Sequence, residues 1–258
     1  MSTWTAMARP NRAPRSAGAA TTKAPRSSAE RDAYHHGDLR NALLEAAVKL
    51  VQQDGPDGFS LREAARLVGV SPAAAYRHFP DKLHLLAALS IDSHARLATH
   101  MEKALASVEG TPGTKAHAVR SLQAIGEAYV DHAVRHPEHF RIMFRGEIRQ
   151  LEGFKPGAAK SGRDAFQILL DTLDGLVAAG AISREDRVGA ELSTWAGVHG
   201  LASLMVSCAL PLPAKARPAA VWTLFRAAIR GLGADPSLIP PGQPLSVDPR
   251  EGNPLFPK

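Results

Sequence analysis

The sequence predicts an all-α protein, and three observations support this fold class. Apolar residues recur at three- and four-residue spacing along most of the chain, as they do on the buried face of a helix. Serine, proline and glycine stand where such helices would begin and end. No segment alternates polar and apolar residues as a half-buried strand does. With 258 residues, 45% of them hydrophobic, the chain can bury a sizeable core in one or two domains.

The first segment is basic and lacks any apolar period. Residues 1–31 carry six arginine and lysine residues against Glu30 alone, so they hold most of the net charge of +6. This composition predicts a disordered arm over residues 1–33. Two interpretations of the arm stay open: it binds a polyanion by displacing counterions, or it is a solubilising tail or an over-extended start upstream of Met7.

Residues 34–82 predict three helices. The first ends before Gly55 and Pro56. Its apolar face comprises Leu39, Leu43, Ala46, Ala47 and Leu50. The second begins with a capping box between Ser60 and Glu63 and ends at Gly69, where a left-handed residue is tolerated. Ser71 as N-cap and Pro72 as first helical residue start the third.

The second and third of these helices have the spacing of a helix-turn-helix, because only three or four residues separate them. The small side chains of Pro72, Ala73 and Ala74 would let the start of the third helix approach the floor of a DNA major groove. Hydroxyl, imidazole and cationic groups that hold phosphates follow at Tyr76, Arg77, His78 and Lys82. An ordinary helical hairpin with a polar outer face is the alternative interpretation.

A long helix is predicted from Asp81 toward Val108, with Leu97, Met101 and Leu105 on one face. Unbroken, it would span on the order of 40 Å and would act as a lever between the first domain and the rest. Further helices are predicted around Leu122 to Tyr129, from Pro137, over Phe166–Leu176, from Ser183 to Cys208, and over 217–232. The helix from Ser183 is apolar nearly all round, so both of its sides must be covered. Residues 234–258 contain seven prolines and predict a poorly ordered tail.

Cellular location and redox state follow from two further observations. No apolar run reaches the roughly eighteen residues of a membrane helix, and the N-terminus lacks a secretory signal, so we expect a cytoplasmic protein without membrane contact. The single cysteine, Cys208, excludes an internal disulfide framework. A buried, inert thiol is the expected state of Cys208, with redox sensing as the alternative.

The run from Tyr34 to about Leu89 closely resembles the N-terminal DNA-binding domain of the TetR family of bacterial transcription regulators. The resemblance rests on Ser-Leu-Arg from residue 60, Gly-Val-Ser over 69–71, Tyr-Arg-His-Phe over 76–79 and Asp-Lys over 81–82. It implies that Ser60 and Tyr76 contact phosphate, that Lys82 contacts the DNA backbone from the long helix, and that Arg62 and residues 72–74 face bases. Residues 72–74 have no side-chain hydrogen-bonding group, so base readout would depend on thymine methyl groups, on Arg62 and on DNA shape.

The C-terminal half is similar to the effector domain of those TetR-type regulators named for a Trp-His-Gly motif. The similarity rests on His136-Pro137-Glu138, on the following Phe-Arg-Ile-Met-Phe over 140–144, and on Trp195-Ala-Gly-Val-His199-Gly200. It implies a domain that binds a small molecule and dimerises through its last two helices, here about 184–208 and 217–232. A two-fold dimer would place its recognition helices about 34 Å apart on a pseudo-palindromic operator.

Large apolar or amphipathic side chains on these helices are the candidates for effector contact. They are Tyr129, Phe140, Met143, Phe144, Phe166, Trp195, His199 and Met205. Most of them would serve as core in any helical domain. His199, one turn beyond Trp195, is the candidate polar anchor, and a satisfied core histidine is the alternative interpretation.

Two other functional classes remain as alternatives. His132 and His136 lie one turn apart with His139 nearby, a spacing compatible with zinc or nickel and hence with a metal-responsive regulator. No Gly-rich phosphate loop, nucleophile elbow or carboxylate pair is evident, so we expect no catalytic residue, cofactor or bound metal. A non-specific DNA-coating protein led by the basic arm is the remaining alternative.

Together these observations predict a basic arm (1–33), a helix-turn-helix domain (34–82), an effector-binding and dimerisation domain (83–233) and a Pro-rich tail (234–258). The expected function is a homodimeric transcription factor, most simply a repressor that a small-molecule effector releases from double-stranded DNA. The sequence identifies neither the effector nor the operator, and an activator stays an open alternative.

Overall fold

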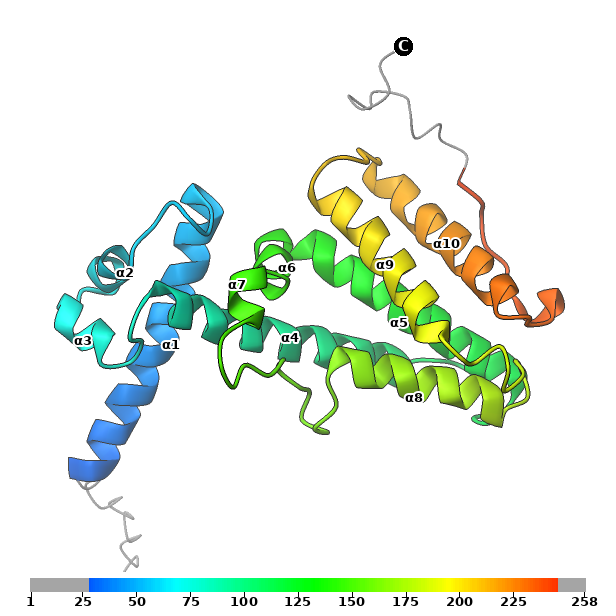
Figure 1. Cartoon of the computed structure of the whole chain (residues 1–258), viewed down its shortest axis with the longest axis horizontal. Helices are drawn as coiled ribbons and strands as arrows, with labels where there is room; N and C mark the ends of the chain where they lie inside the picture. Colours follow the sequence, from blue (N-terminus) through cyan, green and yellow to red (C-terminus); the bar gives the residue numbers. More distant parts are fainter. Residues whose placement is uncertain (1–27, 246–258) are drawn as a thin grey trace, which may run out of the picture. The chain divides into compact units, whose positions relative to one another are not determined.

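The computed structural model describes residues 28–245, and side chains from Leu39 onward. Every regular element in this range is a helix (Figure 1), which confirms the all-α prediction. The chain divides into two units, Met1–Asp38 and Leu39–Lys258, and the helix-turn-helix and all later helices belong to the second. Most of the expected basic arm, residues 1–27, and residues 246–258 of the expected tail lie outside the described range.

The first three helices are α1 (Ser28–Asp54), α2 (Leu61–Val68) and α3 (Pro72–Tyr76). The predicted capping box is present: the Glu63 N–H donates to Ser60 Oγ at 3.2 Å, and the Ser60 N–H donates to the Glu63 carboxylate at 2.7 Å. Gly69 ends α2 in the left-handed conformation, with φ of 79°. Ser71 then accepts from the Ala74 N–H at 3.2 Å and so caps α3. The helix-turn-helix prediction is confirmed down to its caps.

Helix α4 (Lys82–Ala106) is the predicted long helix, and the Asp81 carboxylate caps it by accepting the His84 N–H at 2.9 Å. Its 25 residues span about 37 Å. Leu85 and Leu89 near its start pack in the core of the N-terminal helices, whereas Leu97 and Met101 pack in the core of the C-terminal half. The two cores therefore divide along α4, beyond the boundary expected at residue 82.

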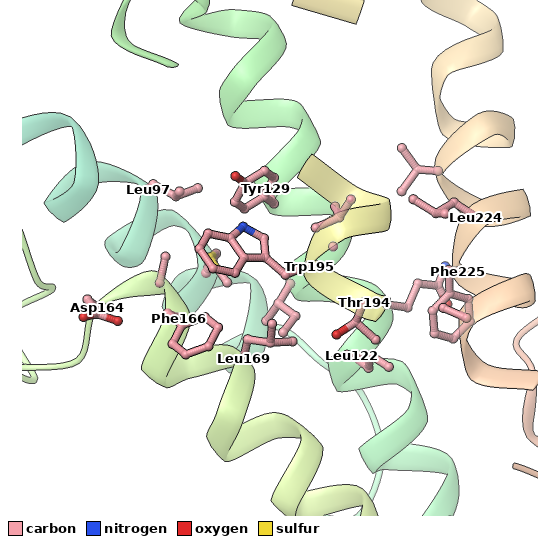
Figure 2. Close-up of a pocket in the computed structure, with 18 of the residues that line it drawn as sticks. Leu97, Leu122, Tyr129, Asp164, Phe166, Leu169, Thr194, Trp195, Leu224 and Phe225 are labelled. Atoms are coloured by element: carbon pink, nitrogen blue, oxygen red, sulfur yellow. The ribbon is translucent and has the colours of Figure 1, made fainter. Parts of the chain in front are cut away.

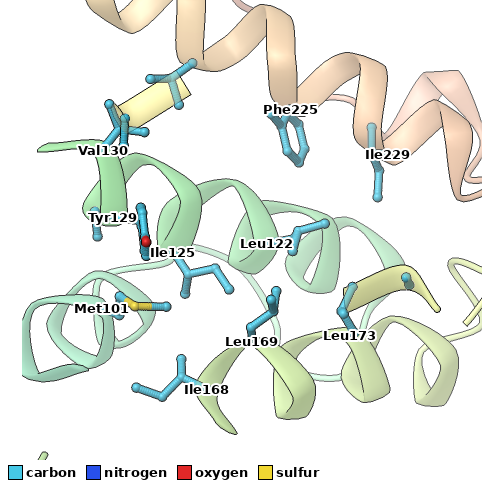
Figure 3. Close-up of a cluster of buried hydrophobic side chains, with 14 of the residues drawn as sticks. Met101, Leu122, Ile125, Tyr129, Val130, Ile168, Leu169, Leu173, Phe225 and Ile229 are labelled. Atoms are coloured by element: carbon cyan, nitrogen blue, oxygen red, sulfur yellow. The ribbon is translucent and has the colours of Figure 1, made fainter. Parts of the chain in front are cut away.

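Six further helices and two 3₁₀ turns make up the C-terminal half. They are α5 (Lys115–Arg135), α6 (Pro137–Met143), α7 (Gly146–Arg149), α8 (Ala165–Ala178), α9 (Ala190–Val206), η1 (Ala214–Ala216), α10 (Arg217–Gly231) and η2 (Pro236–Leu238). Helix α5 is central, because it packs against α4, α8, α9 and α10 (Figure 1). Figure 3 shows the resulting core, where side chains of α5 meet those of α4, α8 and α10.

Three segments differ from what the sequence predicts. Helix α9 begins at Ala190 rather than at Ser183: the Ser183 hydroxyl does bond Asp186, but Gly189 at φ of 74° interrupts the helix. Cys208 is exposed rather than buried, since it lies past the end of α9 in a left-handed turn.

The first part of the expected tail is also different, because residues 234–245 pack along α10 instead of extending away. The Trp222 indole N–H donates to the Pro240 carbonyl at 3.1 Å, and the Leu245 N–H donates to Thr223 Oγ1 at 3.2 Å. Leu238 and Ile239 pack against the C-terminal core. Apolar and hydrogen-bonded contacts thus hold a stretch that its proline content alone would leave extended.

Leu173 tests the C-terminal core, because its side chain is fully buried in the middle of α8 (Figure 3). Leu173→Ala removes apolar contacts and leaves a cavity, so the free energy of unfolding should fall by about 2–5 kcal/mol. Leu67→Ala, at an exposed leucine of α2, is the matched control and should change it by less than about 0.5 kcal/mol. Urea unfolding followed by circular dichroism measures both, and equal effects would contradict this account of the core.

Candidate DNA-binding surface and ligand cavity

The outer surface of α2 and α3 presents most of the expected DNA contacts to solvent. Exposed residues of this set are Arg62, Ser71, Pro72, Ala73, Tyr76 and Arg77, and Ser60, His78 and Lys82 are half-buried. Ala74 differs, because its side chain is only 9% exposed and turns towards the domain. The exposed members of the expected base-facing group are therefore Arg62, Pro72 and Ala73.

Lys82 is held by the loop between α1 and α2. Its Nζ donates to the Asp57 carbonyl oxygen at 3.1 Å and lies 5.4 Å from the centre of the Phe59 ring. The Asp57 carboxylate in turn pairs with both terminal nitrogens of Arg145, at 2.9 and 3.3 Å. The hydrogen bond from Arg145, and then its charge, lower the pKa of Asp57. The loop beside the DNA-binding helices is thus tied to the residue that precedes α7.

Two residues from the C-terminal half complete the core of the N-terminal helices. Ile142 of α6 is 1% exposed and Ile148 of α7 is fully buried, and both belong to the same cluster as Leu43, Phe59 and Leu85. The neighbours of Ile142 in α6, Phe140 and Met143, are buried in the other core. We call residues 137–149 the α6–α7 segment. The sequence predicted α6 but gave no sign of α7 or of this division.

A cavity of about 380 Å³ lies in the C-terminal half, between α4, α5, α8, α9 and α10 (Figure 2). Its wall is mostly apolar, with leucine, isoleucine, valine and methionine side chains beside five aromatic side chains, four of which belong to the expected set. In Figure 2 the Trp195 indole stands in the middle, with Tyr129 on one side and Phe166 and Leu169 on the other. The size and lining are typical of a small-molecule site.

Half of the expected effector-binding residues line this cavity. They are Tyr129, Phe144, Phe166 and Trp195. Phe140 and Met143 are instead buried in the core, and Met205 packs against it. His199 is not part of the cavity wall; its Nδ1 lies 2.8 Å from the Tyr129 hydroxyl oxygen. The side chain of His199 therefore has a partner within the protein, as in the alternative interpretation.

Tyr129 links this histidine to the cavity. Burial raises the pKa of the Tyr129 hydroxyl, and a side-chain hydrogen bond with Trp195 opposes that shift only partly. The hydroxyl therefore keeps its proton at neutral pH and can donate it to His199. Burial, followed by the charge of Arg149, lowers the pKa of His199, which favours the neutral imidazole that accepts such a bond. The Phe144 ring closes the group, 4.4 Å from the His199 ring centre.

Several polar residues of the cavity wall were not predicted. They are His94, Gln123, Arg149, Asp164 and Thr194. His94 lies on the buried face of α4, and Arg149 and Asp164 lie at opposite ends of the connection between α7 and α8. No spacing in the sequence brings them together, since only the packing of α4 and α8 does so. Only His94 gave a signal in the sequence, because it is a polar residue on a helix face that is predicted to be buried.

The histidines of the metal-binding alternative do lie together, on α5 and α6. The ring centres of His132 and His136 are 5.1 Å apart, and those of His136 and His139 are 5.9 Å apart. His139 bonds Ser93 Oγ at 2.8 Å, which occupies one of its nitrogens. Within the described residues no group of three or more histidine, cysteine or acidic side chains is arranged to hold a metal ion. The geometry does not support the metal-responsive alternative.

Comparison with protein families identifies this architecture. The family model described as "Bacterial regulatory proteins, tetR family" matches residues 43–89. A second family model, "Tetracyclin repressor-like, C-terminal domain", matches residues 122–232. The chain belongs to the TetR family. As in that family, an N-terminal DNA-binding helix-turn-helix precedes a helical C-terminal domain, here connected by α4. The comparison with curated proteins gives no match.

Solved structures of similar proteins agree with the TetR assignment. A protein of unknown function from Rhodococcus sp. RHA1 is 30% identical, with a TM-score of 0.61 over 77% of this chain and 97% of that one. A regulatory protein of the TetR family from Rhodococcus RHA1 is 16% identical, with a TM-score of 0.54 over 76% and 98%. A TetR family regulator from Marinobacter aquaeolei VT8 is 19% identical, with a TM-score of 0.53 over 80% and 99%. At these low identities, the last two similarities show that the fold is shared.

Among the described residues, none of the helices is both long and apolar enough to cross a membrane.

His132 gives a prediction for the dependence of stability on pH. Burial, reinforced by the charges of neighbouring histidines, lowers the pKa of His132 from 6.5 to about 4. Between these two values the unfolded chain binds a proton that the folded chain does not, so the free energy of unfolding decreases as pH falls from about 6.5 to about 4. The His132 contribution amounts to at most about 3 kcal/mol.

Comparison with His132→Gln isolates this contribution, because His94, His139 and His199 also have lowered pKa values and act in the same direction. The variant should lose less stability than the original protein between pH 7 and pH 4.5 in urea titrations at each pH. Parallel pH profiles for the two proteins would show that His132 is not the buried neutral group.

Proposed function

We propose that this TetR family regulator is a repressor that binds a pseudo-palindromic operator and is released when a small molecule occupies the cavity. One observation carries the proposal: the α6–α7 segment takes part both in the core under the DNA-binding helices and in the cavity. Phe144 and Arg149 line the cavity, while Ile142 and Ile148 fill the N-terminal core. A ligand that moves the first pair must therefore disturb the second.

The contacts of Arg145 support the same route. This residue stands between the two short helices and reaches Asp57, whose carbonyl oxygen holds Lys82 at the start of α4. Displacement of the α6–α7 segment would thus act on the loop before α2 and on the first turn of α4 together. We infer that effector binding favours a second arrangement of the DNA-binding helices relative to the cavity domain.

The free energy that an effector must supply depends on how far it shifts the equilibrium between the two arrangements. To turn a 1:99 equilibrium between the two arrangements into 99:1, the effector must prefer one of them by about 5.5 kcal/mol. A ligand with a weaker preference would only reduce repression. If the arrangement that the effector prefers does not fit the operator, effector binding releases the protein from DNA. If that arrangement does fit, effector binding recruits the protein to DNA. We take release as the simpler assumption.

A homodimer is the second part of the proposal. Val188 is 84% and Leu192 is 70% exposed, and Leu204 further along α9 is exposed as well. Exposed large apolar residues favour burial against a partner, and α10 packs beside α9. We propose that α9 and α10 pair with those of a second copy, which would place two reading helices about 34 Å apart.

The subtype, the cellular location and the mode of base contact complete the proposal. Trp195, His199 and Gly200 occur together on α9, and the Tyr129–His199 contact gives the pair a packing role, so we propose the Trp-His-Gly subtype. A regulator of this kind would act in the cytoplasm, on double-stranded DNA, without catalysing a reaction. The exposed apolar residues of α2 and α3 suit base contact through methyl groups and DNA shape rather than through many hydrogen bonds.

Selection of bound DNA from a random pool with the full-length protein tests the proposal as a whole. We expect enrichment of a pseudo-palindrome whose half-sites lie about one helical turn apart. Recovery of unrelated sequences, bound only at low salt, would mean that the basic residues grip phosphates without reading bases. The enriched sequence then serves as the operator probe for the variants below.

Tyr76 is expected to hold a phosphate through its exposed hydroxyl. Tyr76→Phe keeps the ring and removes one hydrogen bond, so affinity should fall by roughly tenfold, and by a similar factor on the operator and on unrelated DNA. Fluorescence anisotropy with operator and scrambled probes measures the two factors. A loss confined to a single base position of the operator would instead make Tyr76 a base-reading residue.

Leu192 tests the dimer. Leu192→Glu places a charge in the proposed interface but leaves the core of the single chain unchanged, because the side chain is already exposed. Light scattering after size-exclusion chromatography should then report a monomer, and operator affinity should fall by at least about a hundredfold at submicromolar protein. Ile91→Glu, at an exposed apolar residue of α4, is the control. A dimer in the Leu192 variant would place the interface elsewhere.

A further inference from the structure

One charged side chain in the cavity wall lacks a partner. Arg149 is exposed to solvent and also lines this mainly apolar cavity, and its guanidinium makes no hydrogen bond and no ion pair within the described residues. The arginines nearest to it along the chain are different: Arg145 pairs with Asp57 and Glu147, and Arg163 pairs with Glu102 and Asp171. The structure thus leaves a solvent-accessible guanidinium available in the wall of the proposed ligand cavity.

The groups that face Arg149 leave it available for an anion. His94 of α4 is buried, and its Nδ1 donates to the Ser90 carbonyl oxygen at 2.8 Å, so Nε2 carries the lone pair of the neutral ring. Burial lowers the pKa of His94, and the charge of Arg149 adds to that effect. The Asp164 carboxylate also lines the cavity, but it accepts the Gln167 N–H at 2.8 Å and caps α8. Neither group neutralises the guanidinium directly.

The part of the wall formed by Phe166, Leu169 and Trp195 is suited to an apolar body. The Phe166 and Trp195 rings lie 5.0 Å apart, and Figure 2 shows them beside Leu169. A molecule that fills this part buries apolar area, which is the main source of affinity in such cavities. A planar carboxylate matches the fork of a guanidinium and is bound through two parallel N–H donors.

We propose that the cavity binds an amphipathic organic monocarboxylate, with its apolar body against Trp195 and Phe166 and its carboxylate on Arg149. This assignment of ligand class rests on the proposed function, in which the cavity is the effector site. Arg149 is the last residue of α7 and directly follows Ile148, which fills the core under the DNA-binding helices. A carboxylate on Arg149 therefore pulls on the residue next to the one that couples the two domains.

Three probes of equal chain length test the ligand class: octanoate, octan-1-ol and octylamine, measured by titration calorimetry on the full-length protein at pH 7. We expect octanoate to bind most tightly and octylamine least tightly. Arg149→Gln should weaken octanoate by about tenfold or more, the size of one charge-assisted pair, and leave octan-1-ol within about twofold. Arg184→Gln, at an exposed arginine outside the cavity, is the matched control and should change neither affinity.

Asp164→Asn gives a second test in the opposite direction. Asparagine caps a helix as well as aspartate does, so α8 should be retained, while removal of the negative charge should raise octanoate affinity a few-fold. Equal binding of octanoate and octan-1-ol, indifference of octanoate to Arg149→Gln, or failure of all three probes to bind would overturn the proposal.

Operator release, followed by anisotropy with the same probes, separates this proposal from the proposed function. Octanoate binding that depends on Arg149 but leaves operator affinity unchanged supports the ligand class and contradicts the effector role of the cavity. If octan-1-ol binds in the cavity and releases the operator, and octanoate binds no more tightly, the effector role of the cavity is supported and the carboxylate ligand class is contradicted. The two ideas can therefore fail separately.

Discussion

The division of the α6–α7 segment between two hydrophobic cores is the constraint on which the rest of the structure depends. Neighbouring residues of one short helix, Ile142 and Met143, are buried in different cores. A helix of seven residues has little stability of its own, so packing on both sides fixes where it lies. The N-terminal core is in turn incomplete without Ile142 and Ile148, which makes the DNA-binding helices dependent on the domain that follows.

The α6–α7 segment also contacts the aromatic and hydrogen-bonded group beside the cavity. Phe144 contacts the His199 ring, and His199 is joined through Tyr129 to the Trp195 indole in the middle of the cavity. The aromatic and hydrogen-bonded group around Tyr129 therefore positions the cavity wall and the end of α6 together. In this arrangement His199 supports the cavity wall without lining it, because its Nδ1 is engaged by the Tyr129 hydroxyl.

Local signals in the sequence were sufficient for the helices and for their caps. The Ser60–Glu63 box, Gly69 and Ser71-Pro72 act within a few residues, so the pattern determined the helix-turn-helix directly. The start of α9 was misplaced because a correct capping pair at Ser183 and Asp186 is followed by Gly189, and a single left-handed glycine outweighs one cap. Cys208 was misplaced for a related reason, since the apolar run continues past the last helical residue.

The cavity was predictable only in part, because its wall is assembled from six helices, α4, α5, α7, α8, α9 and α10. Tyr129, Phe144, Phe166 and Trp195 could be proposed as large residues on inward faces, yet the same rule selected Phe140 and Met143, which fill the core. Helical periodicity tells which face is buried and does not tell whether that face meets a neighbour or a void. Arg149 and Asp164 lie in or beside short connections where periodicity carries no information, so packing alone could reveal them.

Close packing also limits how the segment can respond to a ligand. Ile148 is fully buried, and an interior packed to normal density does not yield continuously. Withdrawing Ile148 without replacement would leave a void in the N-terminal core, at about 24 cal/mol for each Å³. A graded shift is therefore unfavourable, and the alternatives are the present packing or a second one in which another side chain fills the gap. Leu151 and Phe154, which already pack at the edge of this core, are the residues placed to do so. In the proposed mechanism, the way the core is shared therefore favours a two-state response over a graded one.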